Sequence, residues 1–219
     1  MSRPSPKVLF LTKYARNGAS SRYRTFQYLP WFDQAGIHYT LSPLFDDAYL
    51  AHKYAHGRAH PVAVLRAFMH RFWTVLAIPR NSTVVIEYEL IQYFPALLER
   101  WLAWRGCRMV VDYDDALFHQ YDTHPSPWVR RLLGGKIAEV MRLAHIVVVG
   151  NAYLANYARL SGARRVRLIP TVVDLSLYTV KNTAKLSTVF TIGWIGSPTR
   201  RSSVSSGNKL SLMRFGHCC

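Results

Sequence analysis

The chain has 219 residues, of which 50% are hydrophobic and 13% aromatic, which excludes an intrinsically disordered protein and allows a sizeable core. Its 28 lysines and arginines against 12 acidic residues give a formal net charge of +16. A field of this size attracts anionic partners such as phosphates, nucleotides, nucleic acid or anionic lipid. Three cysteines are too few for a disulfide framework.

Short apolar β-type runs alternate with helical patterns along the chain. A strand is predicted at residues 7–11 and a helix at 21–35, which ends at Gly36. Residues 46–60 have no clear pattern. The further strands are predicted at residues 37–41, 84–86, 109–111, 146–149 and 166–169. The further helices are predicted at residues 62–78, 94–104, 128–143 and 152–160.

Continuous apolar strands separated by helices are typical of a parallel sheet covered on both faces, so we predict a doubly wound, Rossmann-like α/β domain over residues 1–170. Residues 171–187 are interpreted as a linker. Residues 188–199 predict the first strand and loop of a second domain, which we expect to be truncated. Such a strand would lack neighbours, and we expect it to be poorly ordered. Residues 200–219, basic and serine-rich, predict a non-native, disordered tail.

The loop after the first strand is a candidate anion site. Glycine lets a backbone approach a ligand closely, a helix start offers unpaired N–H groups, and arginine adds positive charge. The alternative is an ordinary turn in which Ser20 or Ser21 caps the following helix. The candidate ligands of a diphosphate in this loop are Asn17, Gly18, Ser20 and Arg22.

The densest acidic cluster follows the fourth strand and contains Asp112, Asp114 and Asp115. Carboxylates at a strand end can share a proton, hold a divalent metal or accept a hydrogen bond from a sugar hydroxyl. The alternative is a solvated loop in which Asp114 or Asp115 caps a short helix. After the third strand, Glu87 and Glu89 flank a tyrosine and could line the same cleft.

Two further features concern metals and membranes. His52, His56 and His60 are spaced by four residues, but no fourth ligand is evident, so we assign no metal site. The segment 62–78 could lie on an anionic membrane, or it could be a core helix whose arginines extend to solvent. No signal peptide is apparent. We therefore expect a cytoplasmic protein, with the inner face of the membrane as an alternative place.

Six segments of the chain, in order and spacing, resemble bacterial GT-B glycosyltransferases of the retaining group known as family 4 or group 1. The resemblance extends from about residue 7 to residue 199. The matching segments are KVLFL at 7–11, ASSRYR at 19–24, VDYDDA at 111–116, VVVGN at 147–151, LIPTVVD at 168–174 and IGWIGSPT at 192–199.

The resemblance implies two Rossmann-like domains that face each other across a cleft. The N-terminal domain would bind the acceptor, and the C-terminal domain would bind a nucleotide-diphosphate sugar as substrate, with no cofactor or metal required. Gly18 and its neighbours match the loop near the donor diphosphate. Asp114 and Asp115 stand where many relatives carry a histidine near the transferred sugar, and we assign them the catalytic role. The phosphate-side loop of the second domain corresponds to Gly193, Gly196 and Ser197.

Such relatives grip the donor with two glutamates in a Glu-x7-Glu pattern, whereas here Glu139 is the last glutamate and Asp174 is the one acid beyond it. We therefore expect a glycosyltransferase acting on a polysaccharide or other cell-surface acceptor, inactive as this truncated chain. One alternative is a metal-dependent GT-A-type glycosyltransferase that uses Asp112 and Asp114. Another is a basic anion-binding or nucleic-acid-binding module, although no nucleic-acid motif is present and no nucleic acid is expected.

Overall fold

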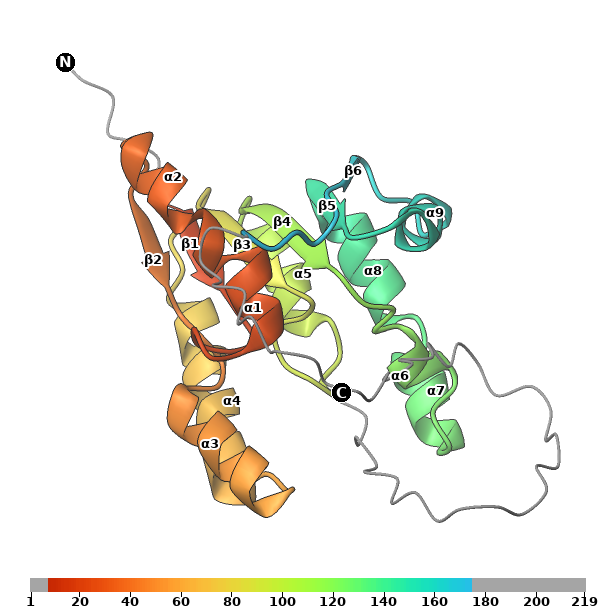
Figure 1. Cartoon of the computed structure of the whole chain (residues 1–219). Coiled ribbons are helices and arrows are strands. Elements are labelled where there is room, and N and C mark those ends of the chain that lie inside the picture. Colours follow the sequence, from red (N-terminus) through yellow and green to blue (C-terminus); the bar gives the residue numbers. More distant parts are fainter. Residues whose placement is uncertain (1–7, 175–219) are drawn as a thin grey trace, which may run out of the picture. The chain divides into compact units, whose positions relative to one another are not determined.

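A computed structural model describes residues 8–174 of the chain (Figure 1). These residues belong to one compact unit that ends at Asp174. The expectations for the end of the linker, for the second-domain strand at 188–199 and for the tail lie outside the described residues. The same holds for Gly193, Gly196 and Ser197.

The six strands form one sheet in the order β2-β1-β3-β4-β5-β6, and every neighbouring pair is parallel. The six strands predicted before residue 170 are confirmed, because each apolar run is long enough to cross a sheet that is covered by helices. The strands are β1 Val8–Leu11, β2 Tyr39–Leu41, β3 Thr83–Glu87, β4 Arg108–Tyr113, β5 Ile146–Val149 and β6 Val166–Leu168.

Helices connect the strands and flank the sheet, which makes the fold α/β and Rossmann-like (Figure 1). The helices before β3 are α1 Ala19–Arg24, the 3₁₀ helix η1 Phe26–Tyr28, α2 Leu29–Gln34, α3 Asp47–His56 and α4 Pro61–Leu76. The helices after β3 are α5 Leu97–Trp104, α6 His119–Asp122, α7 Pro127–Leu133, α8 Lys136–Leu143 and α9 Ala152–Leu160.

Two helices predicted as continuous are interrupted. The helix expected at 21–35 breaks at Thr25, because Pro30 has no N–H for an intrahelical bond and its ring would meet the carbonyl one turn earlier. The helix expected at 128–143 divides into α7 and α8 at the adjacent glycines Gly134 and Gly135, residues with low helix propensity.

The region without a clear pattern, 46–60, contains helix α3. The side chain of Asp46 caps its N-terminus by accepting a hydrogen bond from the Tyr49 N–H at 2.7 Å. Gly57, with φ of +66°, ends the helix in the left-handed conformation that glycine adopts without strain. Both signals are present in the sequence, but the apolar periodicity of this segment is too weak to predict a helix by itself.

The core has two parts, one on each face of the sheet. On one face, side chains from β3, β4 and β5 pack against α4, α5, α8 and α9. On the other face, Val8 and Phe10 of β1 pack against Phe26 of η1 and Leu29 of α2. The sheet is therefore wound on both faces, as predicted, and its carboxyl edge is left to carry polar side chains.

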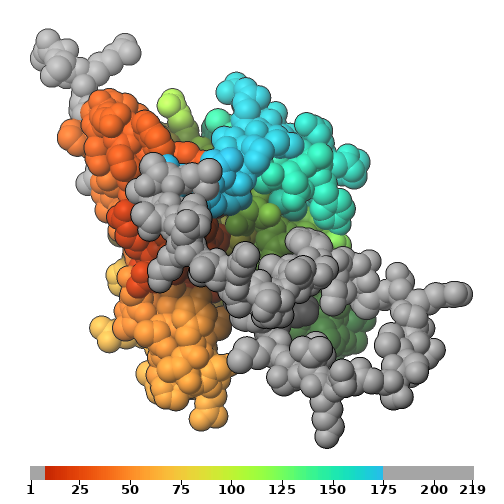
Figure 2. Space-filling model, viewed as in Figure 1, coloured from red at the N-terminus to blue at the C-terminus, as the bar shows by residue number. Residues whose placement is uncertain are grey.

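Helices α3 and α4 lie beside each other and extend away from the sheet (Figure 1), and Figure 2 shows them as an orange lobe. Within residues 8–174, no helix has the length and apolar character needed to cross a bilayer.

Helix α9 provides a direct test of this core. Leu154 is 0% exposed and Leu160, six residues later on the same helix, is 80% exposed. We expect Leu154→Ala to lower the free energy of unfolding by about 2–5 kcal/mol, because the substitution leaves a cavity. The matched control Leu160→Ala should change it by less than about 0.5 kcal/mol. Denaturant unfolding followed by circular dichroism measures both, and equal losses would contradict the packing described.

Candidate functional site

The candidate site lies where the order of strands reverses. Strand β1 stands between β2 and β3, so the chain leaves β1 toward one side for β2 and toward the other side for β3. In open α/β sheets the loops at the carboxyl ends of such strands diverge and form a crevice where ligands bind. The loops after β1, β3 and β4 carry most of the predicted site residues to this edge.

A buried carboxyl group, that of Glu87 at the end of β3, organises this edge. Its Oε1 accepts a hydrogen bond from Ser20 Oγ at 2.6 Å. Its Oε2 accepts hydrogen bonds from Ser21 Oγ at 2.6 Å and from the Lys13 N–H at 3.0 Å. Burial raises the pKa of Glu87, and these hydrogen bonds act in the opposite direction. The side chain predicted to line the cleft therefore holds the β1 loop against β3.

Tyr88, which follows Glu87, connects the ends of three strands. Its backbone has φ of +62°, a conformation that costs a non-glycine residue about 1–3 kcal/mol and that concentrates at functional sites. Its hydroxyl lies 3.0 Å from Ser20 Oγ and donates a hydrogen bond to Asp114 Oδ1. Burial, together with the nearby Asp114 carboxylate, raises the pKa of the Tyr88 phenol, so the phenol remains a donor.

An ion pair holds Asp112, the last but one residue of β4. Arg24 Nε donates to Asp112 Oδ2 at 2.9 Å, and Arg24 Nη2 binds the other carboxylate oxygen. The two side chains are 3% and 13% exposed. Burial raises the pKa of Asp112, and pairing with Arg24 lowers it again. Arg24 also donates to the Ile169 carbonyl at 2.5 Å, which ties the chain after β6 to this edge.

This pairing bears on the Asp-x-Asp alternative, because both oxygens of Asp112 are already bound by a guanidinium. Asp114 engages Tyr88, and Asp115 is exposed and accepts a hydrogen bond from the Ala116 N–H at 2.7 Å. Among residues 8–174 there is no group of three or more His, Cys, Asp or Glu side chains that could hold a metal ion. The structure thus brings Asp114, but not Asp115, into the network around Tyr88.

The residues predicted to bind a diphosphate make contacts within the protein. The Asn17 N–H donates to Asp47 Oδ1 at 3.1 Å. Gly18 is buried, and a Cβ there would overlap the side chain of Tyr14, so close packing requires this glycine. The guanidinium of Arg22 lies 4.8 Å from the centre of the neighbouring tyrosine ring.

The serines of this loop do not cap the helix, contrary to the alternative interpretation. The N-cap position of α1 is Gly18, which makes no side-chain capping bond. Ser20 and Ser21 instead donate to Glu87. The sequence contains no signal that these serines would bind Glu87, because more than sixty residues separate them from it.

A second buried polar cluster holds the loop after β3. Glu89, which was predicted to line the cleft with Glu87, accepts hydrogen bonds from the Tyr121 hydroxyl at 2.8 Å to each carboxylate oxygen. It also forms a buried ion pair with Lys136. Lys136 Nζ donates to the Ile91 carbonyl at 2.7 Å. Sequence reasoning missed this role of Lys136, whose one signal is its place among the apolar residues that α8 buries.

Comparisons with known proteins do not assign a family. No protein-family model matches the sequence, and no curated protein is significantly similar to it. The function of the site is therefore inferred from its geometry and from the residues it assembles.

Because the ion pair between Arg24 and Asp112 is buried, removal of the Arg24 guanidinium should strongly lower the free energy of unfolding. Arg24→Met leaves the Asp112 carboxylate buried and unpaired, which should lower the free energy of unfolding by about 3–5 kcal/mol. The double variant Arg24→Met/Asp112→Leu should recover most of the loss. Arg100→Met, which breaks the surface pair with Glu139, should cost less than about 1 kcal/mol. Urea unfolding provides the comparison, and an Arg24→Met loss no larger than that of Arg100→Met would contradict the assignment.

The raised pKa of Glu87 predicts a pH dependence. The folded protein keeps the Glu87 proton to higher pH than the unfolded chain, whose ordinary value is 4.5. The stability contributed by this residue is therefore fully present below pH 4.5 and is lost as the pH rises through the folded pKa. Glu87→Gln removes the titration and leaves the Lys13 N–H facing an amide group, which should cost about 1–3 kcal/mol at low pH.

The measurement is urea unfolding of wild type and Glu87→Gln at a series of pH values. The difference between their free energies of unfolding should shrink as the pH increases. The surface variant Glu139→Gln serves as the control, with a loss of less than about 1 kcal/mol. A difference that grows with pH would show that the fold prefers the ionised carboxylate of Glu87.

Proposed function

We propose that residues 8–174 form the acceptor-side domain of a glycosyltransferase that moves a sugar from a nucleotide-diphosphate sugar to a polysaccharide or other cell-surface acceptor. The observation that supports this most directly is the bridge at the strand-reversal point, where the Tyr88 hydroxyl donates to Asp114 and lies 3.0 Å from Ser20 Oγ. This bridge positions a half-buried carboxylate at the edge of the sheet where α/β domains bind ligands.

Asp114 has the properties that recognition of a sugar hydroxyl requires. One of its oxygens accepts from Tyr88, and among residues 8–174 no side chain occupies the other oxygen, Oδ2. A carboxylate oxygen can accept a hydrogen bond from an acceptor hydroxyl and orient it for transfer. Tyr88 fixes the direction of the carboxylate. Asp115 stands beside it on the exposed side of the loop.

A metal-independent version is favoured over the Asp-x-Asp alternative. The first aspartate of that pair is bound through both oxygens to Arg24, so a metal would have to displace a buried guanidinium. The diphosphate role of Asn17, Gly18 and Arg22 stays a prediction. The hydroxyl of Ser20 donates to Glu87 and its Oγ lies 3.0 Å from the Tyr88 hydroxyl, so its part in the proposed site is to position other side chains.

Binding of saccharides to the full chain tests the proposal. A panel of oligosaccharides is screened on a glycan array, and ligands are measured by saturation-transfer NMR. Asp114→Asn and Tyr88→Phe should each lower the affinity for the saccharide by about tenfold. This is the effect expected from the loss of one charge-assisted hydrogen bond or of the side chain that orients it. The control Asp33→Asn removes one exposed carboxylate elsewhere, on α2, and should leave affinity unchanged.

Two results would contradict the proposal. One is that no saccharide in the panel binds, and the other is that Asp114→Asn binds as tightly as the wild type. A strict requirement for Mn²⁺ in saccharide or nucleotide-sugar binding would instead favour the Asp-x-Asp alternative, because Asp112 would then have left Arg24 for the metal.

A further inference from the structure

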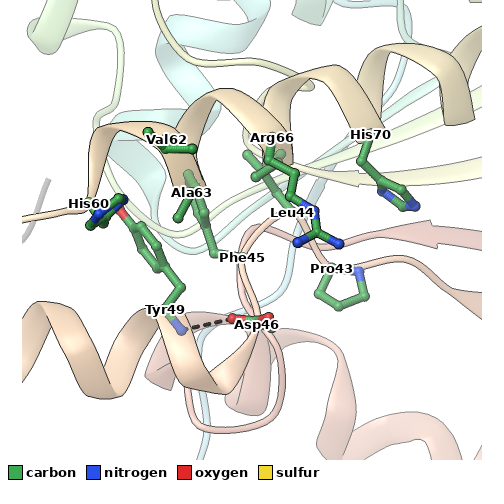
Figure 3. A pocket seen from close by; sticks show the side chains of 11 residues that line it. Pro43, Leu44, Phe45, Asp46, Tyr49, His60, Val62, Ala63, Arg66 and His70 are labelled. Atoms are coloured by element: carbon green, nitrogen blue, oxygen red, sulfur yellow. Dashed lines mark hydrogen bonds between the residues drawn. The ribbon is translucent and has the colours of Figure 1, made fainter.

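A hollow with a volume of about 540 Å³ lies between α4 and the loop that leaves β2 (Figure 3). Helix α3 contributes Tyr49 to its wall. The hollow shares no residue with the Glu87 and Tyr88 network, although Leu44 lines both this hollow and a small indentation beside Lys13 and Tyr88. It is therefore a separate candidate for a binding site.

One wall of the hollow is cationic. Arg66 and His70 are one turn apart on α4, and Figure 3 shows that both side chains leave the helix on the same side, with Arg66 directed toward Pro43 and Leu44. Neither side chain has a hydrogen bond or ion pair with another described residue. His60, at the N-cap of α4, stands at the far end of the same wall.

A buried positive charge lies on the same helix, α4. The Arg71 side chain is fully buried, and its Nη2 donates to the Thr12 carbonyl at 2.9 Å and to the Ser42 carbonyl at 2.7 Å. These partners are neutral, and no carboxylate among residues 8–174 forms a salt bridge with Arg71. Burial lowers the pKa of Arg71 to about 10, while the electrostatic action of the Glu87 carboxyl group raises it, so Arg71 remains charged at neutral pH. Ser42 directly precedes the loop that lines the hollow.

One acidic residue, Asp46, opposes these charges. Its carboxylate caps α3 by accepting from the Tyr49 N–H at 2.7 Å, so part of its charge is offset by the helix N-terminus. The rest of the hollow is largely apolar. Phe45 and Tyr49 stack with ring centres 4.1 Å apart, and Val62 and Ala63 face them from α4. The hollow thus offers a positive wall next to an apolar surface.

We propose that this hollow binds the phosphate group of an amphipathic ligand, with Arg66 and His70 as its donors and the apolar part of the ligand against Phe45, Tyr49 and Ala63. Arginine and histidine donate charge-assisted hydrogen bonds to phosphate oxygens, and Arg71, the residue after His70, adds a buried positive charge that Glu87 offsets in part. The inference does not rest on the proposed sugar transfer, because Arg66, His70, Phe45, Tyr49 and Ala63 have no place in the polar network at the carboxyl ends of β1 and β3.

The phosphate could belong to a free ligand or to a lipid headgroup. Helix α4 exposes Val62, Leu65, Met69 and Trp73 at helical spacing, so a lipid source has an apolar surface next to the hollow. Both sources require the same contact between the phosphate group and the Arg66–His70 wall. The experiments below distinguish one source from the other.

The test uses octyl phosphate as the probe and isothermal titration calorimetry on the full chain. Wild type should bind it saturably, and Arg66→Gln/His70→Gln should weaken binding at least tenfold. Both side chains are exposed on α4, so the double variant should fold, which its circular dichroism spectrum verifies. Arg159→Gln removes an exposed cation from α9 as the matched control and should bind like wild type.

Binding of the protein to phosphatidylcholine vesicles with and without phosphatidic acid distinguishes the two sources of the phosphate group. Binding only to vesicles with phosphatidic acid, lost in the double variant, would support a lipid headgroup. Binding of octyl phosphate without vesicle binding would support a free phosphate ligand. The proposal is overturned if octyl phosphate does not bind saturably, or if Arg159→Gln weakens it as much as the double variant does, since binding would then follow net charge alone.

Discussion

The buried carboxyl group of Glu87 is the interaction on which the carboxyl edge of the sheet depends. Removing a carboxyl group from water is costly unless hydrogen bonds replace the lost hydration, and here two hydroxyls and one backbone N–H do so. The same bonds fix the loop after β1, and with it Ser20. Ser20 Oγ also lies 3.0 Å from the Tyr88 hydroxyl, which donates to Asp114, so Glu87 and Asp114 belong to one network of polar contacts.

Two buried ion pairs support this arrangement on either side. Arg24 and Asp112 join α1 to the end of β4, and Lys136 and Glu89 join α8 to the loop after β3. Such pairs contribute little net stability compared with apolar packing, but breaking one partner is strongly destabilising. Their effect is to fix the loops at the carboxyl edge of the sheet. In a chain with a net charge of +16, the acidic side chains at this edge are thus mostly held by internal partners.

The fold could be predicted from the sequence because its signals are local. Apolar runs mark the strands, and α9 is bounded by the Asn151 cap, which accepts from the Leu154 N–H at 2.9 Å, and by Gly162 at φ of +81°. The wrong continuous helices also had local causes, Pro30 and the paired glycines at 134–135. These breaks were visible in the sequence, and apolar periodicity across them concealed their effect.

Local signals in the sequence indicated the edge of the sheet at which the candidate site lies, but they could not predict the contacts that its side chains make. Strand ends pointed to Glu87 and Asp114, since ligands bind at the carboxyl edge. The partners could not be found, because Arg24 and Asp112 are 88 residues apart and nothing local in the sequence links them. The left-handed backbone of Tyr88 is likewise imposed by tertiary contacts, since a tyrosine does not favour it. Residue types indicated the chemistry, and only the assembled fold shows which carboxylates are engaged.

The most direct measurement is a titration of the Glu87 carboxyl carbon by NMR, together with the amide of Lys13 that it binds. We predict a pKa for Glu87 above 4.5, and the amide signal of Lys13 should shift with the same midpoint. A Lys13 amide that does not follow the Glu87 titration would show that this carboxyl group does not join β3 to the loop after β1. A Glu87 pKa below 4.5 would contradict the predicted direction and would show that the hydrogen bonds outweigh burial.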